Sequence, residues 1–291
     1  MPELPDLRIL ADAFTAALAR RELLASDIRQ PLVLRGTSAE LAALVGHRLD
    51  RVEQRGKFLT LRFAEHRIVI NAMLTGRLGM AEPRSKAFPQ TAVTLTFGAR
   101  SPVQAADPAD DWTAGADWLP SDDEPVELRY RDSRKMGKIY VLLAGVDRDV
   151  AGWQALGPDA DDGALDLAAW RGRIKRHGGE LQNLLKNQEF VAGIGNGYND
   201  EVLWAARLAP FRKRASLAPE ESEELWRASR EVMGWAIDEL KLRVPPRFEK
   251  EVRDFLRVHR KGGQACPRCG TTLSEVSPGG FVTTWCRSCQ V

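Results

Sequence analysis

Near its end the chain reads Cys266-Pro-Arg-Cys269, then sixteen residues, then Cys286-Arg-Ser-Cys289. Two C-x2-C pairs at this separation are typical of a four-cysteine zinc site, because each pair forms a tight turn that directs two thiolates to one point. Residues 273–276 and 281–285 between the pairs predict a β-hairpin. Two disulfides are the less favoured alternative, since the first residues show no export signal. A segment this short buries no core of its own, so we expect one structural Zn²⁺ held by Cys266, Cys269, Cys286 and Cys289.

The chain as a whole has the composition of a folded protein. It has 291 residues, of which 44% are hydrophobic and 28% charged, and these values exclude a disordered chain. The length predicts two domains, with or without an appendage. No apolar run approaches the roughly 18 residues that cross a bilayer, and the first residues do not resemble a secretory signal. We therefore expect a cytoplasmic protein with no membrane contact.

Charge is distributed unevenly along the chain. Lys and Arg number 42 and Asp and Glu 40, but residues 101–127 hold eight acids and no Lys or Arg. The other 264 residues therefore carry a net charge of +10, which permits a polyanionic partner. We expect the acidic stretch to be a long, mobile insertion between strands. Its role stays open: it is inert, docks a partner, or shields the binding surface.

The first half of the sequence predicts strands flanked by helices. Residues 5–21 place apolar side chains at helical spacing, and Thr37 to Glu40 match a capping box that begins a second, short helix. Strands are expected at 49–53, 58–63, 67–73, 92–97, 126–131 and 139–143. Successive strands with few helices between them favour an antiparallel β-sandwich.

After about residue 150 the pattern becomes helical. Helices are expected at 165–176, 180–186, 199–207 and 219–241, and Pro245 and Pro246 end the last of them. We predict an α+β multidomain protein. Its parts are an N-terminal antiparallel β-sandwich flanked by helices at 1–150, a helical domain at 151–262, and the zinc-finger hairpin at 263–291.

The N-terminus offers the best candidate for catalysis. If Met1 is removed, Pro2 exposes a secondary amine beside the carboxylate of Glu3. A neutral amine attacks carbonyl-type carbon and forms a cationic Schiff base, and an α-amino group titrates near ~8. Glu3 would then move protons. Read alone, such a start is more often a frayed terminus than an active site.

Further motifs follow in order along the chain. They are Arg55-Gly-Lys57-Phe-Leu, Leu74-Thr-Gly-Arg77-Leu, Asp132-Ser-Arg134-Lys-Met-Gly137, Leu156-Gly-Pro158, Gln188-Glu-Phe-Val-Ala-Gly-Ile-Gly195-Asn196 and the cysteine hairpin. Together with Met1-Pro-Glu-Leu-Pro-Asp6 they resemble the formamidopyrimidine-DNA glycosylase / endonuclease VIII family of base-excision repair enzymes. The resemblance spans essentially the whole chain.

The resemblance implies a two-lobed protein with DNA in its cleft, the second lobe being a helix–two-turns–helix domain that carries the zinc hairpin. It implies that Pro2 attacks C1′ of the damaged nucleotide, that Glu3 assists, and that β- and δ-eliminations cut the strand. Lys57, on a β-strand, would contact phosphate beside the reacting sugar. Asn196 would hold a phosphate at a helix start.

The same resemblance implies that side chains fill the space left by an extruded base. Leu74, Arg134 and Met136 fall at those positions, although ordinary core packing is the alternative for Leu74 and Met136. Asp6 falls near the lesion pocket, and Asn71 at a phosphate contact.

Four positions depart from the family pattern. Met136 replaces phenylalanine, Asn71 replaces histidine, and Asp6 is shorter than the usual glutamate. Phe281 stands where an arginine grips phosphate, and an apolar ring supplies neither its charge nor its hydrogen bonds. Candidates to replace that arginine are Lys261, Arg268 and Arg287.

We therefore expect a bifunctional enzyme, a DNA glycosylase that is also an abasic-site lyase. Its substrate would be double-stranded DNA that contains a damaged base or an abasic site. We expect it to be a monomer located on the nucleoid. Residues 242–258 leave little room for a long base-capping loop, which favours oxidised pyrimidines, ring-opened purines or abasic sites over 8-oxoguanine. One alternative is a damage-binding relative with weakened or lost excision. Another is a zinc-ribbon adaptor for protein or RNA.

Overall fold

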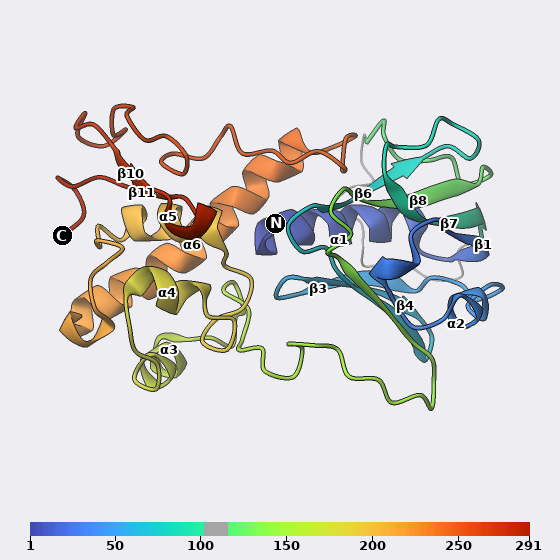
Figure 1. Cartoon of the computed structure of the whole chain (residues 1–291), viewed down its shortest axis with the longest axis horizontal. Helices are drawn as coiled ribbons and strands as arrows, with labels where there is room; N and C mark the ends of the chain where they lie inside the picture. The colour runs from blue at the N-terminus through green and yellow to red at the C-terminus, as the bar shows by residue number, and fades with distance from the viewer. Residues whose placement is uncertain (102–115) are drawn as a thin grey trace. The chain divides into compact units, whose positions relative to one another are not determined.

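The structure, a computed structural model, describes residues 1–101 and 116–291 (Figure 1). The chain divides into two compact units. The strand-rich unit comprises Met1–Pro2, Asp6–Ala151 and Lys241–Glu251. The helical unit comprises Glu3–Pro5, Gly152–Leu240 and Val252–Val291. Pro2 and Glu3, adjacent in sequence, thus belong to different units, and the proposed division into three domains stays a prediction.

The strand-rich unit contains two sheets, as the sequence predicts. The four-stranded antiparallel sheet has the order β1 (Arg21–Ile28), β7 (Thr91–Arg100), β8 (Val126–Asp132), β6 (Gly76–Ala81). The five-stranded sheet has the order β2 (Leu34–Arg35), β9 (Lys138–Leu142), β5 (His66–Asn71), β4 (Phe58–Phe63), β3 (Arg51–Arg55). Its strands pair antiparallel, except that β2 runs parallel to β9.

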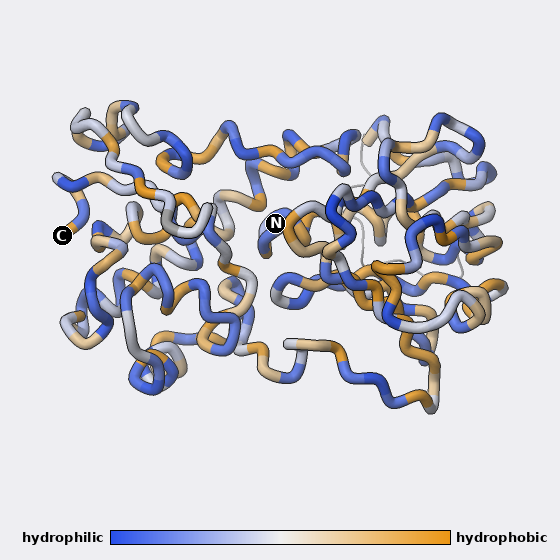
Figure 2. Tube along the Cα trace, in the orientation of Figure 1, coloured by the Kyte–Doolittle hydropathy of each residue, from blue (hydrophilic) through white to orange (hydrophobic). Residues whose placement is uncertain are grey.

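All six expected strands are present, and β1, β2 and β6 are additional. Strand β2 has two residues, too few for a periodic pattern, and β6 contains Gly76 and Gly79, which disfavour strands when read alone. Hydrophobic residues gather along the strands of the five-stranded sheet (Figure 2). Pairing with neighbouring strands therefore makes strands of segments such as β2 and β6, whose own residues do not indicate a strand.

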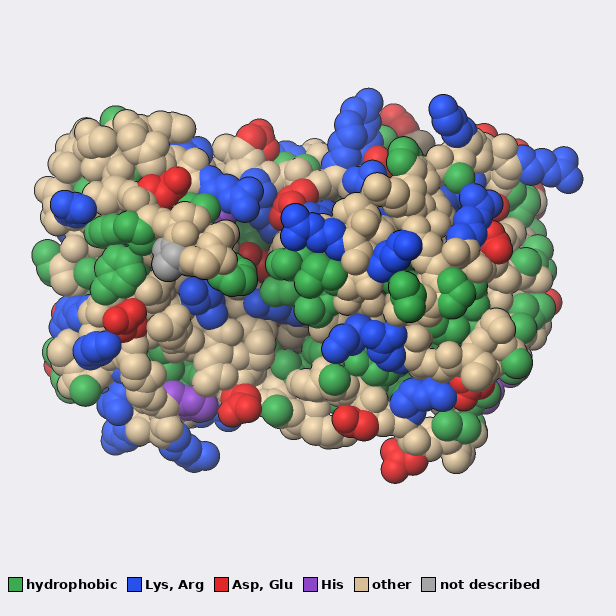
Figure 3. All heavy atoms as spheres, in the orientation of Figure 1, with side chains coloured by type: hydrophobic (Ala, Val, Ile, Leu, Met, Phe, Trp, Pro, Cys, Tyr) green, Lys and Arg blue, Asp and Glu red, His purple; other side chains and the backbone are tan. Residues whose placement is uncertain are grey.

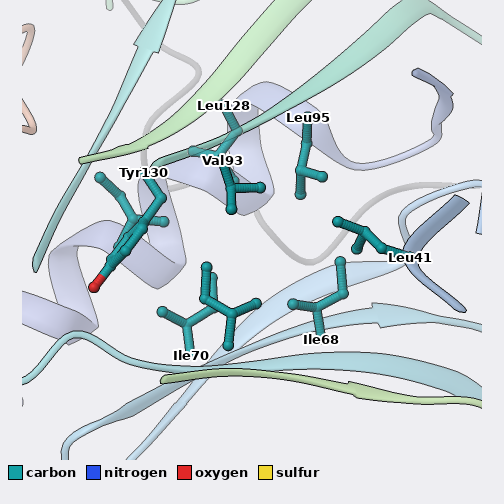
Figure 4. Close-up of a pocket in the computed structure, with 9 residues that line it drawn as sticks. Leu41, Ile68, Ile70, Val93, Leu95, Leu128 and Tyr130 are labelled. Carbon is teal, nitrogen blue, oxygen red and sulfur yellow. The ribbon is translucent and has the colours of Figure 1, made fainter. Parts of the chain in front are cut away.

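The two sheets pack face to face around an apolar core. A small cavity remains between them, lined by Ile68, Ile70 and Ile139 from one sheet and by Leu78, Val93, Leu95, Leu128 and Tyr130 from the other (Figure 4). Leu41 closes it from α2 (Ser38–Ala42), which begins with the predicted capping box of Thr37 and Glu40. The predicted sandwich is confirmed.

Helix α1 (Leu4–Leu18) ends three residues before its predicted end. Arg20 takes a positive φ of 67°, which turns the chain into β1 at Arg21. The expected apolar side chains Leu7, Phe14 and Leu18 are buried.

The helical unit contains the predicted helices: α3 (Leu167–Ile174), α4 (Leu181–Lys186), α5 (Asn196–Ala205) and α6 (Pro219–Arg243), whose last residues belong to the strand-rich unit. Short 3-10 turns lie at Pro31–Val33, Arg214–Ser216 and Pro278–Gly280. The predicted hairpin is β10 (Ser274–Val276) paired with β11 (Thr283–Trp285). Leu4 packs with Trp170, Tyr198 and Leu225 in the core of this unit.

The acidic stretch separates β7 from β8. Residues 102–115, with Asp107, Asp110 and Asp111, lie outside the described residues, so the expectation of a mobile loop applies to a part that the structure does not describe. The part of the stretch that follows residue 115 is anchored. The buried guanidinium of Arg21 donates to the carbonyl oxygens of Ser121 at 2.7 Å and Glu124 at 2.6 Å. Among the described residues, no helix is both long and apolar enough to span a membrane.

Candidate functional site

Glu3 is buried and held by several hydrogen bonds. Its side chain is 4% exposed. The carboxylate accepts hydrogen bonds from the backbone N–H groups of Gly195 at 2.6 Å, Gly197 at 2.9 Å and Tyr198 at 3.3 Å. These donors form the first turn of α5, whose N-cap residue, Gly195, has no side chain to cap them. A carboxylate from a distant part of the chain thus takes the place of the N-cap, and the charge suits the helix dipole there.

This contact explains why α5 begins at Asn196, earlier than the predicted Asn199. A capping residue far away in sequence leaves no local signal, so the pattern alone placed the start one turn late.

The glycines before α5 make room for the N-terminal segment. Gly193 has φ of 96°, and its carbonyl oxygen accepts the Leu4 N–H at 3.0 Å. A Cβ at Gly193 would lie 2.5 Å from the Leu4 Cβ, and one at Gly195 would lie 2.5 Å from the Glu3 Cδ. Only glycine permits so close an approach. These glycines therefore serve the Glu3 contact, which the sequence could not reveal.

Pro2 is buried and follows Met1 in the strand-rich unit. The Met1 amino nitrogen lies 4.0 Å from a carboxylate oxygen of Glu251, which also pairs with Arg77 at 2.6 Å. While Met1 is attached, the Pro2 nitrogen is part of an amide and is not nucleophilic. Removal of Met1 would convert it to the secondary amine that the predicted chemistry requires.

The prediction that Lys57 lies on a β-strand is wrong. Lys57 lies in the two-residue turn of the β3–β4 hairpin. Arg55 pairs with Phe58 across this turn, and Gly56 takes a φ of 55°. Tight hairpin turns need positive φ values, which glycine supplies, so the strand must break at Gly56. Lys57 is half-buried at the tip of a short, rigid hairpin.

Asp6 and Asn71 lie at the ends of elements. Asp6 is half-buried in the first turn of α1. Asn71 ends β5, opposite Lys138 of β9, and its side-chain oxygen accepts the N–H of Met73 at 3.1 Å. The Asn71 oxygen therefore shapes the turn that follows the strand. Neither residue's predicted contact with DNA is tested by this geometry.

Leu74, Arg134 and Met136 lie on two turns of the strand-rich unit. Leu74 is half-buried in the β5–β6 turn, and the other two are exposed in the β8–β9 turn, with Met136 37% exposed. None of the three is a core residue. The two turns meet at the buried carboxylate of Asp132, to which sequence reasoning gave no role.

Asn196 is the first residue of α5, at the helix start that the family resemblance implies, although the helical pattern alone placed that start at Asn199. Its amide donates to the carbonyl oxygen of Val282, just before β11, and so ties the helix to the hairpin. Phe281, next to Val282, is 57% exposed. Of the candidates to replace the missing arginine, Arg268 stacks on Trp204 at 4.2 Å and donates to its carbonyl oxygen at 2.9 Å. Arg268 is thus engaged within the protein.

The four cysteines converge as predicted. Their Sγ atoms all lie within 4.8 Å of one another. The indole N–H of Trp204 donates to the Cys266 Sγ at 3.4 Å, and hydrogen bonds from Thr271 lower the pKa of the Cys269 thiol to about 6. Four converging thiols, one of them readily ionised, form a donor set that fits Zn²⁺.

Buried hydrogen bonds of Asp200 fix the hairpin to α5. Asp200 Oδ2 lies 2.7 Å from His259 Nδ1 and accepts the Thr284 N–H of β11 at 3.0 Å. Burial raises the pKa of Asp200 to about 6, although the hydrogen bond with His259 opposes the rise. His259 is therefore part of the buried contacts at this junction. Lys and Arg side chains are scattered over the visible face of each unit rather than gathered in a single patch (Figure 3).

Comparisons with known proteins cover both units. Residues 1–139 match the formamidopyrimidine-DNA glycosylase N-terminal domain, and residues 156–244 match the formamidopyrimidine-DNA glycosylase H2TH domain. The formamidopyrimidine-DNA glycosylase of Thermomicrobium roseum is 30% identical over 305 residues, covering 100% of this chain and 99% of the relative. That of Moorella thermoacetica is 28% identical, covering 95% of this chain and 94% of the relative.

Solved structures show the same fold. The crystal structure of MutM (Fpg) from Thermus thermophilus matches with a TM-score of 0.79 at 27% identity, covering 99% of this chain and 98% of that one. Lactococcus lactis Fpg in complex with DNA containing an abasic site matches with a TM-score of 0.81 at 20% identity and supports the fold alone. It covers 99% of both chains.

Proposed function

Because this chain belongs to the formamidopyrimidine-DNA glycosylase family and is a DNA glycosylase of base-excision repair, we propose that it also cleaves abasic sites, with the Pro2 nitrogen as nucleophile. The observation that carries the proposal is the position of Glu3, locked onto the first turn of α5 directly after Pro2 in sequence. The family comparisons do not favour a relative that binds damage without excising it.

The proposed chemistry follows from a neutral secondary amine. The Pro2 nitrogen attacks C1′ of the nucleotide, the bond from C1′ to the base breaks, and the base leaves with a proton. Opening of the sugar ring yields an iminium ion between Pro2 and C1′. Loss of a C2′ proton then breaks the bond from C3′ to its phosphate, and a second elimination releases the 5′ phosphate. Water hydrolyses the iminium and frees the amine.

Glu3 is the proposed proton carrier for these steps. Three backbone N–H groups fix its carboxylate, so its position costs no reordering when substrate binds. A fixed group of this kind transfers a proton along one direction, to or from the opening sugar ring.

The DNA contacts are proposed residue by residue. Lys57 and Asn196, with Asn71, would hold phosphates, and Asp6 would line the lesion pocket. Leu74, Arg134 and Met136 would fill the space of the extruded nucleotide, with Arg134 hydrogen-bonding the orphaned partner base. The substrate is double-stranded DNA with an oxidised or ring-opened base or an abasic site, bound by a monomer.

The cysteine cluster would hold one Zn²⁺ through Cys266, Cys269, Cys286 and Cys289. The ion would act structurally, because four protein thiolates leave no position for a substrate. Through Asn196 and Asp200 it would keep the hairpin aligned with α5.

Borohydride trapping on abasic-site DNA tests the proposal. The zinc-loaded, full-length protein, with loss of Met1 verified by mass spectrometry, should yield a covalent protein–DNA adduct. The adduct should be lost in a protein whose N-terminus carries one extra, retained residue, which turns the Pro2 nitrogen into an amide. DNA binding without an adduct, or an adduct that survives blocking of the N-terminus, would contradict the role of Pro2. Duplexes that each hold one lesion would then identify the base.

A further inference from the structure

A single buried carboxylate holds both turns that carry the predicted space-filling side chains. Asp132 is the last residue of β8, pairs with Gly76 of β6, and is 1% exposed. Its Oδ1 accepts hydrogen bonds from the Thr75 hydroxyl and from the Arg134 N–H at 3.2 Å. Its Oδ2 accepts the Gly137 N–H at 2.7 Å and the Tyr130 hydroxyl at 3.2 Å.

Three of these donors, Thr75, Arg134 and Gly137, come from two turns far apart in sequence. Thr75 directly follows Leu74 in the β5–β6 turn. Arg134 and Gly137 flank Met136 in the β8–β9 turn. Thr75 and Arg134 share one oxygen atom of Asp132, so the spacing of the two turns is set by that atom.

Tyr130 reinforces the same junction. Its ring lines the apolar cavity, and its hydroxyl points away from that cavity (Figure 4). A Cβ at Gly76 would lie 2.2 Å from the hydroxyl oxygen, and one at Gly137 would lie 1.7 Å from it. The hydroxyl is therefore wedged between the backbones of the two turns, and only glycine fits at both positions.

The charge of Asp132 is stabilised where it lies. Burial alone would raise the pKa of its carboxyl, but the hydrogen bonds from Thr75, Gly137, Arg134 and Tyr130 outweigh burial and hold the pKa below its ordinary value. A carboxylate has about four acceptor positions, and four donors occupy those of Asp132. Its acceptor capacity is thus used within the protein, which suits a positioning role rather than proton transfer.

We propose that Asp132 is a positioning residue that joins the two turns into one preformed wedge, presenting Leu74, Arg134 and Met136 together to the gap left by an extruded nucleotide. This inference rests on the proposed function of those three residues. If the turns moved independently, ordering them would oppose every insertion into the duplex. A preformed wedge avoids that cost.

Two variants test the proposal, each compared with a matched control. D132N replaces one acceptor oxygen by a donor, and T75V removes only the bond from the β5–β6 turn. The control, T91V, removes a buried threonine hydroxyl of the same sheet that donates to the Phe88 carbonyl at 2.7 Å and is not one of the four donors to Asp132. Single-turnover cleavage is measured on abasic-site duplex and on abasic-site single strand, where no partner strand leaves a gap to fill.

We expect D132N and T75V to cleave the duplex about tenfold more slowly or worse, while cleavage of the single strand changes by less than about twofold. T91V should match the wild type on both substrates. Equal losses on the two substrates would show a merely structural role and overturn the proposal, as would an unchanged rate on duplex.

A fluorescent base beside the abasic site separates this inference from the proposed lyase activity. If the wild type cleaves neither substrate, the lyase proposal fails, and the fluorescence rise on binding duplex still reports insertion of the wedge. A rise that is reduced in D132N and T75V supports the positioning role, and a rise equal to that of the wild type contradicts it.

Discussion

Among single residues, Glu3 combines a proposed catalytic role with a structural one. It is the proposed proton carrier, and it is also the only side-chain cap that the described part of the chain gives to the first N–H groups of α5. Sequence reasoning found the first role through the Met1-Pro-Glu start and missed the second. The next residue, Leu4, packs in the core of the helical unit. The Glu3 cap and the packing of Leu4 therefore hold this short segment in that unit together.

This double use predicts that E3Q loses stability as well as activity. An amide has one acceptor oxygen, and its NH₂ group would face N–H donors, so we expect the free energy of unfolding to fall by about 1–3 kcal/mol. Urea unfolding of the zinc-loaded protein measures the change. The matched control is E220Q, at an exposed position in the first turn of α6. Equal stability of E3Q and E220Q would show that the cap contributes little.

Among the secondary-structure elements, the hairpin β10–β11 depends most on contacts from outside itself. Its strands have three residues each. Hydrogen bonds donated by Thr284 to Asp200 and by Thr283 to Gln182 fix it to α5 and α4. The Asn196 bond to Val282 adds a third link. A hairpin this small cannot fold alone, so the proposed Zn²⁺ and these links would stabilise it together.

Removal of zinc with a strong chelator should therefore release the hairpin and weaken DNA binding, while the sandwich stays folded. The expected signature is loss of amide-exchange protection in residues 263–291 and at the start of α5, with protection of β4, β5 and β9 unchanged. Stoichiometric zinc release measured by a colorimetric indicator provides the reference. Retained protection of the hairpin after complete zinc release would contradict a structural role for the ion.

For the molecule as a whole, we expect charge to govern how DNA is bound. The chain outside residues 101–127 carries +10, and phosphate contacts release counterions when DNA binds. Affinity should therefore fall steeply with salt, with a slope that counts the contacts. Lys57 is one proposed contact, held at a hairpin tip where a single phosphate can reach it.

K57A should accordingly reduce the salt slope by about 0.9 and weaken binding to damaged and undamaged duplexes alike. Fluorescence anisotropy over a range of salt concentrations measures both quantities. R29A serves as the control, since the exposed Arg29 pairs with Asp27 at 2.9 Å. If the salt slope of K57A equals that of R29A and of the wild type, Lys57 does not contact a phosphate.

Elements with a local signal could be predicted from the order of residues alone. Hydrophobic alternation placed six strands, helical spacing placed α1, α3, α4 and α6, and the cysteine spacing placed the metal site. The ordered motifs identified the family. Each of these signals lies within one short segment, because side-chain periodicity and ligand spacing act over a few residues.

Features that depend on distant partners became visible only in the folded chain. The cap of α5 comes from Glu3, and Asp132 joins turns that lie far apart in sequence. Strands β2 and β6 exist because their neighbours pair with them. A hydrogen bond between remote segments leaves no periodic trace in the sequence, so it can be located only when those segments are brought together.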